Sequence, residues 1–160
     1  MKFLSPDQYQ KACHERFDYY LNQIRRLLPA ARVEHVGASS VPGVISKGDL
    51  DILIGVDAHE LEASARILLT LGFQEKKNTL RTAELCMLES TSEDVAFQVV
   101  AIGSEFECFV DFRDRLRASP DLVVQYNVLK KSCEGLSHDE YREKKSTFIE
   151  HVLAQVQHER

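Results

Sequence analysis

Two aspartates separated by one residue, Asp49 and Asp51, have the clearest capacity for chemistry in this sequence. They begin an apolar run that is typical of a buried strand, and alternate side chains of a strand share a face. Two carboxylates roughly 6 Å apart repel by ~3 kcal/mol at an effective dielectric of about 20, and a divalent cation removes that conflict. Mg²⁺ is commonly held by one or two carboxylates and the phosphates of a substrate, so the pair predicts a magnesium site.

A loop upstream of the aspartates has the composition of a phosphate-binding segment. Gly37 permits close approach of the backbone to a phosphate, and the hydroxyls of Ser39 and Ser40 are possible donors to its oxygens. Lys47, at the far end of the loop, is either a phosphate-neutralising residue or a solvated lysine. An isolated Asp-x-Asp also fits a solvated strand end, but the loop and the pair converge at one strand end, which favours a metal-and-phosphate site.

An α/β (α+β) framework must position these residues. Periodicity and turn residues predict helices at 6–28, 58–71, 106–118, 120–134 and 137–158, and strands at 32–36, 50–56, 82–88 and 95–102. The last two strands are expected to form a hairpin. We expect a small mixed sheet flanked by helices, with a helical C-terminal tail packed on it.

The chain length of 160 residues predicts a single domain over 1–160. Within it, 1–30 is the N-terminal helix, 31–103 is the sheet core with the loop and the aspartates, and 104–160 is the tail.

Composition narrows the classes of function. The net charge of −5 argues against binding nucleic acid mainly through phosphate neutralisation. No stretch approaches the ~20 apolar residues of a membrane span, so no membrane association and a cytoplasmic location are expected. The four cysteines and six histidines are dispersed, so zinc is not indicated.

Two separated motifs resemble those of the GrpB family (UPF0157), in the nucleotidyltransferase-fold superfamily. The first is VEHVGASSVPG at 33–43, followed by Lys47, Asp49 and Asp51. The second is FRDRLRASP at 112–120, followed by lysine-bearing helices with Lys130 and Lys144.

The resemblance implies an Mg²⁺-dependent nucleotidyltransferase that moves a nucleoside monophosphate group from a nucleoside triphosphate to an unknown small-molecule or protein acceptor. Asp49 and Asp51 would be the catalytic and metal-binding residues. The nucleotide and its phosphates would be bound by Gly37, Ser39, Ser40, Lys47, Arg113, Arg117 and Lys130. Arg113 also fits an ordinary ion network on a helix surface.

One strand departs from the pattern of the family. Related sequences bring a third carboxylate or a His-x-His pair from the strand predicted at 95–102, where this chain has Ala96 and Gln98. Glu93 and Asp94, just before that strand, are the candidates to replace the missing ligand. The alternative function is therefore a catalytically impaired module that binds a nucleotide or a phosphometabolite, or a partner domain without turnover.

Overall fold

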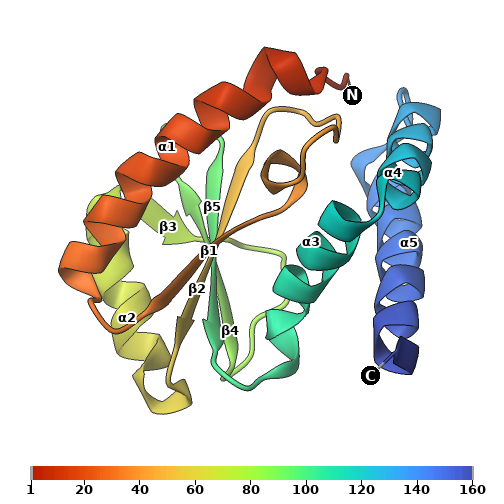
Figure 1. The fold of residues 1–160 in the computed structure, drawn as a ribbon. Helices are drawn as coiled ribbons and strands as arrows, with labels where there is room; N and C mark the ends of the chain where they lie inside the picture. The colour runs from red at the N-terminus through yellow and green to blue at the C-terminus, as the bar shows by residue number, and fades with distance from the viewer. Residues whose placement is uncertain (1, 160) are drawn as a thin grey trace.

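The computed structural model describes residues 2–159, which form one five-stranded sheet with helices on both faces (Figure 1). The strands, in their order across the sheet, are β1 (Arg32–Val36), β2 (Leu50–Val56), β5 (Val95–Ala101), β4 (Leu85–Ser90) and β3 (Phe73–Glu75). β2 and β5 are parallel, and every other neighbouring pair is antiparallel. The predicted mixed sheet is therefore confirmed, as is the hairpin of β4 and β5.

Helices α1 (Pro6–Leu27) and α2 (Leu61–Leu68) cover the first face of the sheet. α1 buries Tyr9, Cys13, Tyr20 and Ile24, whose spacing of four or seven residues places them on one side of a helix. The predicted capping box is present, because the Ser5 backbone N–H donates to Gln8 Oε1 at 2.8 Å. This side of the sheet holds most of the apolar core, and the core packs against β2.

Helix α2 is extended at both ends by single 3₁₀ turns, Ala58–Glu60 and Leu69–Leu71. Gly72 ends the helical segment at φ +88°, a left-handed conformation that glycine adopts without steric cost. The predicted helix at 58–71 therefore occurs as one short α-helix between two tighter turns.

Helix α3 (Cys108–Ala118) covers the second face, on the opposite side from α1 and α2 (Figure 1). The contact is apolar, with Leu53 and Val100 of the sheet packed among Phe106 and Val110. Side chains alternate between the faces of a strand, so Asp51 and Gln98 belong to this second face as well.

The last two helices, α4 (Pro120–Ser132) and α5 (His138–Glu159), pack on α3 and on the loop that follows β1. Val41 and Val44 of that loop contact Leu122, Tyr126 and Val152. The tail thus reaches the sheet through α3, and its other two helices hold the loop in place.

Two differences from the predicted elements have local causes. β4 begins at Leu85 instead of residue 82, because Thr82 donates its N–H to the Leu85 carbonyl oxygen at 3.1 Å in a tight turn. β3 was not predicted: it has three residues, of which only Phe73 is buried, so it shows no alternation.

No helix in the part of the chain described here is long and apolar enough to span a membrane.

Candidate metal and phosphate site

A cavity of about 290 Å³ opens on the second face of the sheet, between the strand ends, the loop after β1 and helix α5. Its charged lining residues are Lys47, Asp49, Asp51, Lys76, Arg142 and Lys145. Two acidic and four basic groups therefore share one small space, which is the charge pattern expected of a site for a cation and a polyanion together.

The two aspartates lie where the sequence predicts, directly before and at the start of β2. Asp51 lies opposite Val36 of β1 and Ala96 of β5. Asp49 Oδ1 accepts a hydrogen bond from Ser46 Oγ at 3.2 Å, and Asp51 Oδ1 accepts one from Gln98 Nε2 at 3.4 Å. Burial and the nearby negative charge of Asp49 raise the pKa of Asp51 to about 6. The carboxylates therefore sit in the unfavourable arrangement that a cation would relieve.

Position 37 requires glycine for two reasons, its backbone conformation and its close contact with Asp51. Its φ is +75°, in the left-handed region that favours glycine. A Cβ atom at this position would lie 2.4 Å from Asp51 Oδ2, a distance that real Cβ contacts do not show. The glycine therefore lets the loop backbone pass directly beside the carboxylate of Asp51.

Ser39 and Ser40 are buried, and their hydroxyls are used within the loop. Ser39 Oγ lies 2.7 Å from His35 Nε2, and Ser40 Oγ donates to the Gly37 carbonyl oxygen at 2.6 Å. Neither serine lines the cavity. In this structure the serines hold the shape of the loop, and phosphate binding by them stays a prediction.

His35 supports the loop as a neutral residue. Its ring stacks on Phe17 with centroids 4.9 Å apart. Burial first, and then the nearby His14, Arg117 and Arg113, lower the pKa of His35 to about 4. The imidazole is therefore uncharged at neutral pH, and its hydrogen bond to Ser39 fixes the start of the loop.

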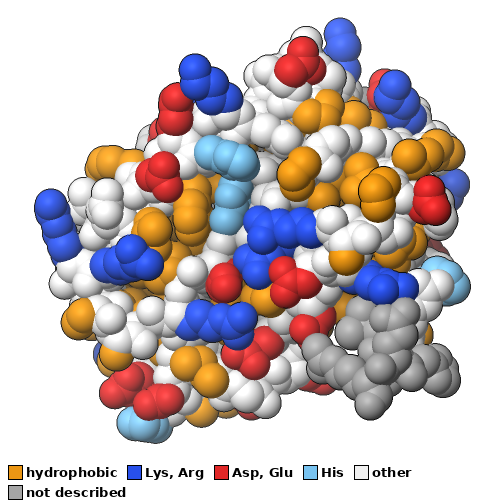
Figure 2. Space-filling model, in the orientation of Figure 1, with side chains coloured by type: hydrophobic (Ala, Val, Ile, Leu, Met, Phe, Trp, Pro, Cys, Tyr) orange, Lys and Arg blue, Asp and Glu red, His pale blue; other side chains and the backbone are white. Residues whose placement is uncertain are grey.

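The three basic residues predicted from the tail contact β1 and the loop that follows it, and they do not line the cavity. Arg113 Nη1 donates to the His35 carbonyl oxygen at 3.0 Å and pairs with Glu34 at 3.3 Å. Arg117 Nε donates to the Ser40 carbonyl oxygen at 3.0 Å. Figure 2 shows acidic and basic side chains intermingled over β1 and α3, the region where these pairs form.

Lys130 is the third of these residues, and it is buried. Its Nζ donates to the Ile45 carbonyl oxygen at 2.8 Å and lies 4.5 Å from the centroid of the Tyr126 ring. Burial lowers the pKa of Lys130 to about 7. None of Arg113, Arg117 and Lys130 is among the lining residues of the cavity, and their donors bind carbonyl oxygens of β1 and of the loop that follows it.

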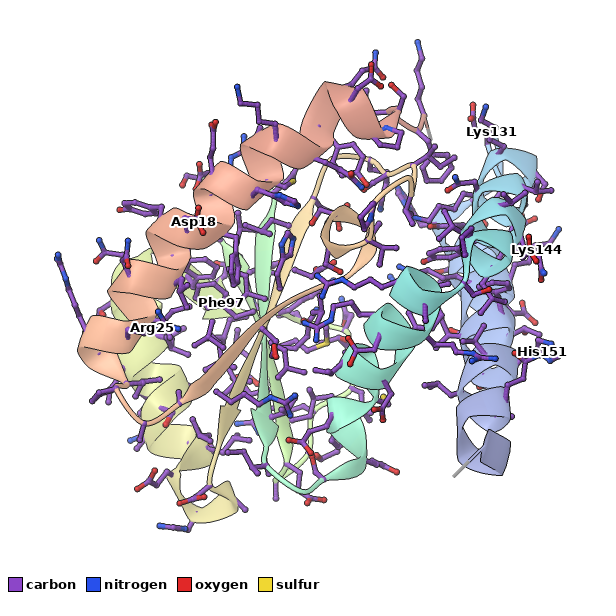
Figure 3. All side chains as sticks on the ribbon, viewed as in Figure 1. Asp18, Arg25, Phe97, Lys131, Lys144 and His151 are labelled. Carbon is purple, nitrogen blue, oxygen red and sulfur yellow. The ribbon has the colours of Figure 1, made fainter. Side chains whose placement is uncertain are left out.

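Apart from Lys47, the basic residues that line the cavity are not among the site residues predicted from the sequence. Arg142 and Lys145 come from α5, and Lys76 follows β3. The signal was present in the spacing of Tyr141, Arg142, Lys145 and Ile149, which repeats every three to four residues along one side of a helix. The resemblance drew attention instead to Lys144, which is exposed and lies on the side of the tail helices away from the sheet (Figure 3).

Among the described residues, Asp49 and Asp51 are the only carboxylates that line the cavity, so none of these residues supplies the missing third carboxylate. Gln98 lines the cavity, whereas Glu93 and Asp94 do not. The Glu93 carboxylate accepts a hydrogen bond from the hydroxyl of Tyr20 and lies near Arg16, on the α1 side of the sheet. The expectation that Glu93 could serve as the third ligand is therefore wrong, because its side chain is held on the other face.

One further group of possible metal ligands lies elsewhere. Asp57, His59 and Glu60 place their ligand atoms within 4.8 Å of one another, and all three are exposed. They follow the far end of β2, whereas Asp51 begins it. Exposed acidic groups are common without a metal, and this cluster is separate from the predicted pair.

Comparisons with known proteins agree on one family. The family model for the GrpB protein matches residues 7–155. A UPF0157 protein of Vibrio cholerae is 60% identical over 157 residues, which is 98% of this chain and 84% of the relative. A UPF0157 protein of Deinococcus radiodurans is 30% identical over 156 residues, with coverage of 96% and 81%.

Two solved structures are similar to this chain and identify its fold. The conserved protein GrpB from Enterococcus faecalis superposes with a TM-score of 0.78 at 20% identity, covering 98% of this chain and 99% of that chain. The Cid1 poly(U) polymerase with bound MgGTP superposes with a TM-score of 0.58 at 14% identity, covering 80% of this chain and 43% of that chain. These likenesses show a nucleotidyltransferase-like fold.

Proposed function

The chain belongs to the GrpB family, and from this premise we propose that its cavity is an Mg²⁺-dependent nucleotidyltransferase site. The site would transfer a nucleoside monophosphate group from a nucleoside triphosphate to a small-molecule or protein acceptor. The observation that supports this most is the meeting of Asp49 and Asp51 with four basic side chains around one cavity. A structural neighbour with this fold was solved with MgGTP bound, which adds support.

The side chains of the cavity fit the parts that nucleotidyl transfer requires. Asp49 and Asp51 would hold Mg²⁺, which when bound supplies charge stabilisation at the phosphate oxygens. Lys47, on the loop, and Lys145, on α5, lie where they would neutralise a triphosphate. Gly37 brings the loop backbone beside Asp51, so phosphate and cation would be held next to each other.

The acceptor we propose is small or is a protein side chain. Helix α5 contributes Tyr141, Arg142, Lys145 and Ile149 to the wall of the cavity, so the space beside the aspartates is narrow. The net charge of −5 also gives the protein no general attraction for a polynucleotide.

A second function is favoured by one specific observation. The third ligand position on the sheet is filled by neutral residues, with Ala96 opposite Asp51 and Gln98 opposite Leu53. A site that lacks a third carboxylate has less negative charge with which to complete a catalytic metal centre. The alternative is therefore a module that binds a nucleotide or a phosphometabolite without turning it over.

A transfer assay separates the two functions. Each nucleoside triphosphate is incubated with the protein, Mg²⁺ and candidate acceptors, and pyrophosphate release is measured for wild type and for Asp49→Asn and Asp51→Asn. Release that both substitutions abolish, and that the control Asp57→Asn leaves unchanged, would establish the transferase. Mg²⁺-dependent nucleotide binding without pyrophosphate release would establish the binding module, and the absence of both would leave a partner domain.

A further inference from the structure

Gln98 carries a buried oxygen atom that has nothing to bind. The residue is only 6% exposed and lines the cavity, yet its Oε1 has no hydrogen-bond partner among the described residues. The other end of the same amide is used, because Nε2 donates to Asp51 Oδ1 at 3.4 Å. Buried carbonyl oxygens are nearly always paired, so the described residues alone do not satisfy the amide of Gln98, which suits a residue that also binds a ligand in the cavity.

The neighbours of Gln98 indicate which kind of ligand this is. The amide nitrogen donates to the carboxylate of Asp51, which offers only acceptor atoms when ionised. Asp49 adds a second carboxylate to the same cavity. Carboxylate and amide oxygens together form the hard oxygen set that suits Mg²⁺, Ca²⁺ and Mn²⁺.

The separation of the two side chains fits a shared ion. The terminal torsion of glutamine is broad, so a half-turn that exchanges the amide oxygen and nitrogen stays within ordinary rotamers. That exchange would put the oxygen where Nε2 now lies, 3.4 Å from Asp51 Oδ1. Adjacent oxygens around an octahedral Mg²⁺, with bonds of ~2.1 Å, lie about 3 Å apart.

We propose that Gln98 is a third protein ligand of the cation held by Asp49 and Asp51, binding through its amide oxygen. The inference rests on the proposed function of the same site. Gln98 thus has two states: its amide nitrogen hydrogen-bonds Asp51 without the cation, and its amide oxygen coordinates the cation when it is bound. A neutral ligand replaces the missing charged one, so the site keeps three protein oxygens with less negative charge.

Calorimetric titration with Mn²⁺ alone, in the full-length protein, tests the ligand. Gln98→Met keeps the length of the side chain and removes both polar atoms, and we expect its Kd for Mn²⁺ to rise about 10-fold or more. Met87→Leu is the matched control, because Met87 lies opposite Gln98 on β4 and lines the same cavity. Its Kd for Mn²⁺ should stay within about two-fold of wild type, since it offers no hard ligand in either form.

A change of metal preference separates a ligand from a residue that only orients Asp51. Gln98→His puts an imidazole nitrogen at a similar reach, and imidazole favours Zn²⁺. The ratio of Zn²⁺ to Mn²⁺ affinity should then rise at least about 10-fold over wild type, an effect that lost orientation of Asp51 would not produce. This variant also decides the question if Gln98→Met does not fold.

The outcomes are distinguishable. Mn²⁺ binding by wild type that Gln98→Met leaves unchanged, or an unaltered metal preference in Gln98→His, would overturn the role of Gln98 and leave the proposed function standing. No Mn²⁺ binding by wild type, with or without a nucleoside triphosphate, would overturn both.

Discussion

Asp51 carries an electrostatic conflict that the described side chains around it do not resolve. It is partly buried, it lies close to Asp49, and its pKa is raised to about 6 by burial and by that neighbouring charge. The hydrogen bond from Gln98 is long, at 3.4 Å, and relieves little of this cost. Such a residue reduces stability in the absence of its ligand, which is typical of a group retained for binding.

We predict that Asp51→Asn stabilises the protein when divalent cations are absent. Because the pKa of Asp51 is higher in the folded protein, at about 6, than in the unfolded chain, at about 4, ionisation of this carboxyl group destabilises the folded state. The stability is therefore highest below about pH 4 and falls as the pH rises through about 6. At pH 7 the substitution should therefore add about 1–3 kcal/mol to the free energy of unfolding, and the gain should disappear towards pH 4. Urea denaturation in chelator across this pH range measures it, and an unstable variant at pH 7 would contradict the account.

Gly37 and Gly43 allow the contact between the loop and Asp51 to be isolated. Both have positive φ angles, +75° and +88°, so an alanine at either position adopts the same kind of unfavourable backbone conformation. Only at Gly37 would the new Cβ meet Asp51, at 2.4 Å, whereas at Gly43 its nearest neighbour is Val123 at 3.5 Å.

We expect Gly43→Ala to cost roughly 1 kcal/mol of stability and Gly37→Ala to cost roughly 1–3 kcal/mol more. Gly37→Ala should also weaken Mn²⁺ binding, because the carboxylate must move. Thermal unfolding and calorimetry of the two variants provide the comparison. Equal losses in both would show that the loop does not depend on its contact with Asp51.

At the scale of elements, the sequence predicted the parts whose signals are local. The apolar runs of β2 and β5, the Gly-Ser loop and the Asp-x-Asp pair were found because each lies within one short segment. The direction in which Arg113, Arg117 and Lys130 point is not encoded locally, because it depends on which carbonyl oxygens of β1 and of the following loop the folded tail meets. For the same reason Lys76, Arg142 and Lys145 were found only in the folded structure.

Helix α5 offers a direct test of its role in the cavity. Lys145 lines the cavity, whereas the neighbouring Lys144 is exposed on the outer side (Figure 3). Lys145→Ala should weaken binding of a non-hydrolysable nucleoside triphosphate by about 10-fold, the loss expected when one charged hydrogen bond to a phosphate is removed. Lys144→Ala removes the same charge from the adjacent position and should leave the affinity within about two-fold, since exposed charges are screened. Equal effects of the two variants would assign the change to net charge alone.

In the molecule as a whole, the two faces of the sheet differ in composition: one carries most of the apolar core, and the other carries the polar cavity. The face under α1 and α2 is apolar and holds the larger core, with Phe73 and Phe97 stacked 3.9 Å apart. The face under α3 and α5 holds the cavity with the aspartates, the glutamine and the lysines. Phe97 points into the core while Gln98, the next residue, faces the cavity, so one strand serves both layers.

The metal-and-phosphate site can be tested by equilibrium binding of a non-hydrolysable nucleoside triphosphate, with and without Mg²⁺, to wild type and to Asp51→Asn. We predict that wild type binds the nucleotide only with Mg²⁺ and that Asp51→Asn loses this binding, although that variant should be folded and more stable without the cation. Binding of equal strength with and without Mg²⁺, or full retention of Mg²⁺-dependent binding in Asp51→Asn, would contradict the assignment of the cavity as a metal-and-phosphate site.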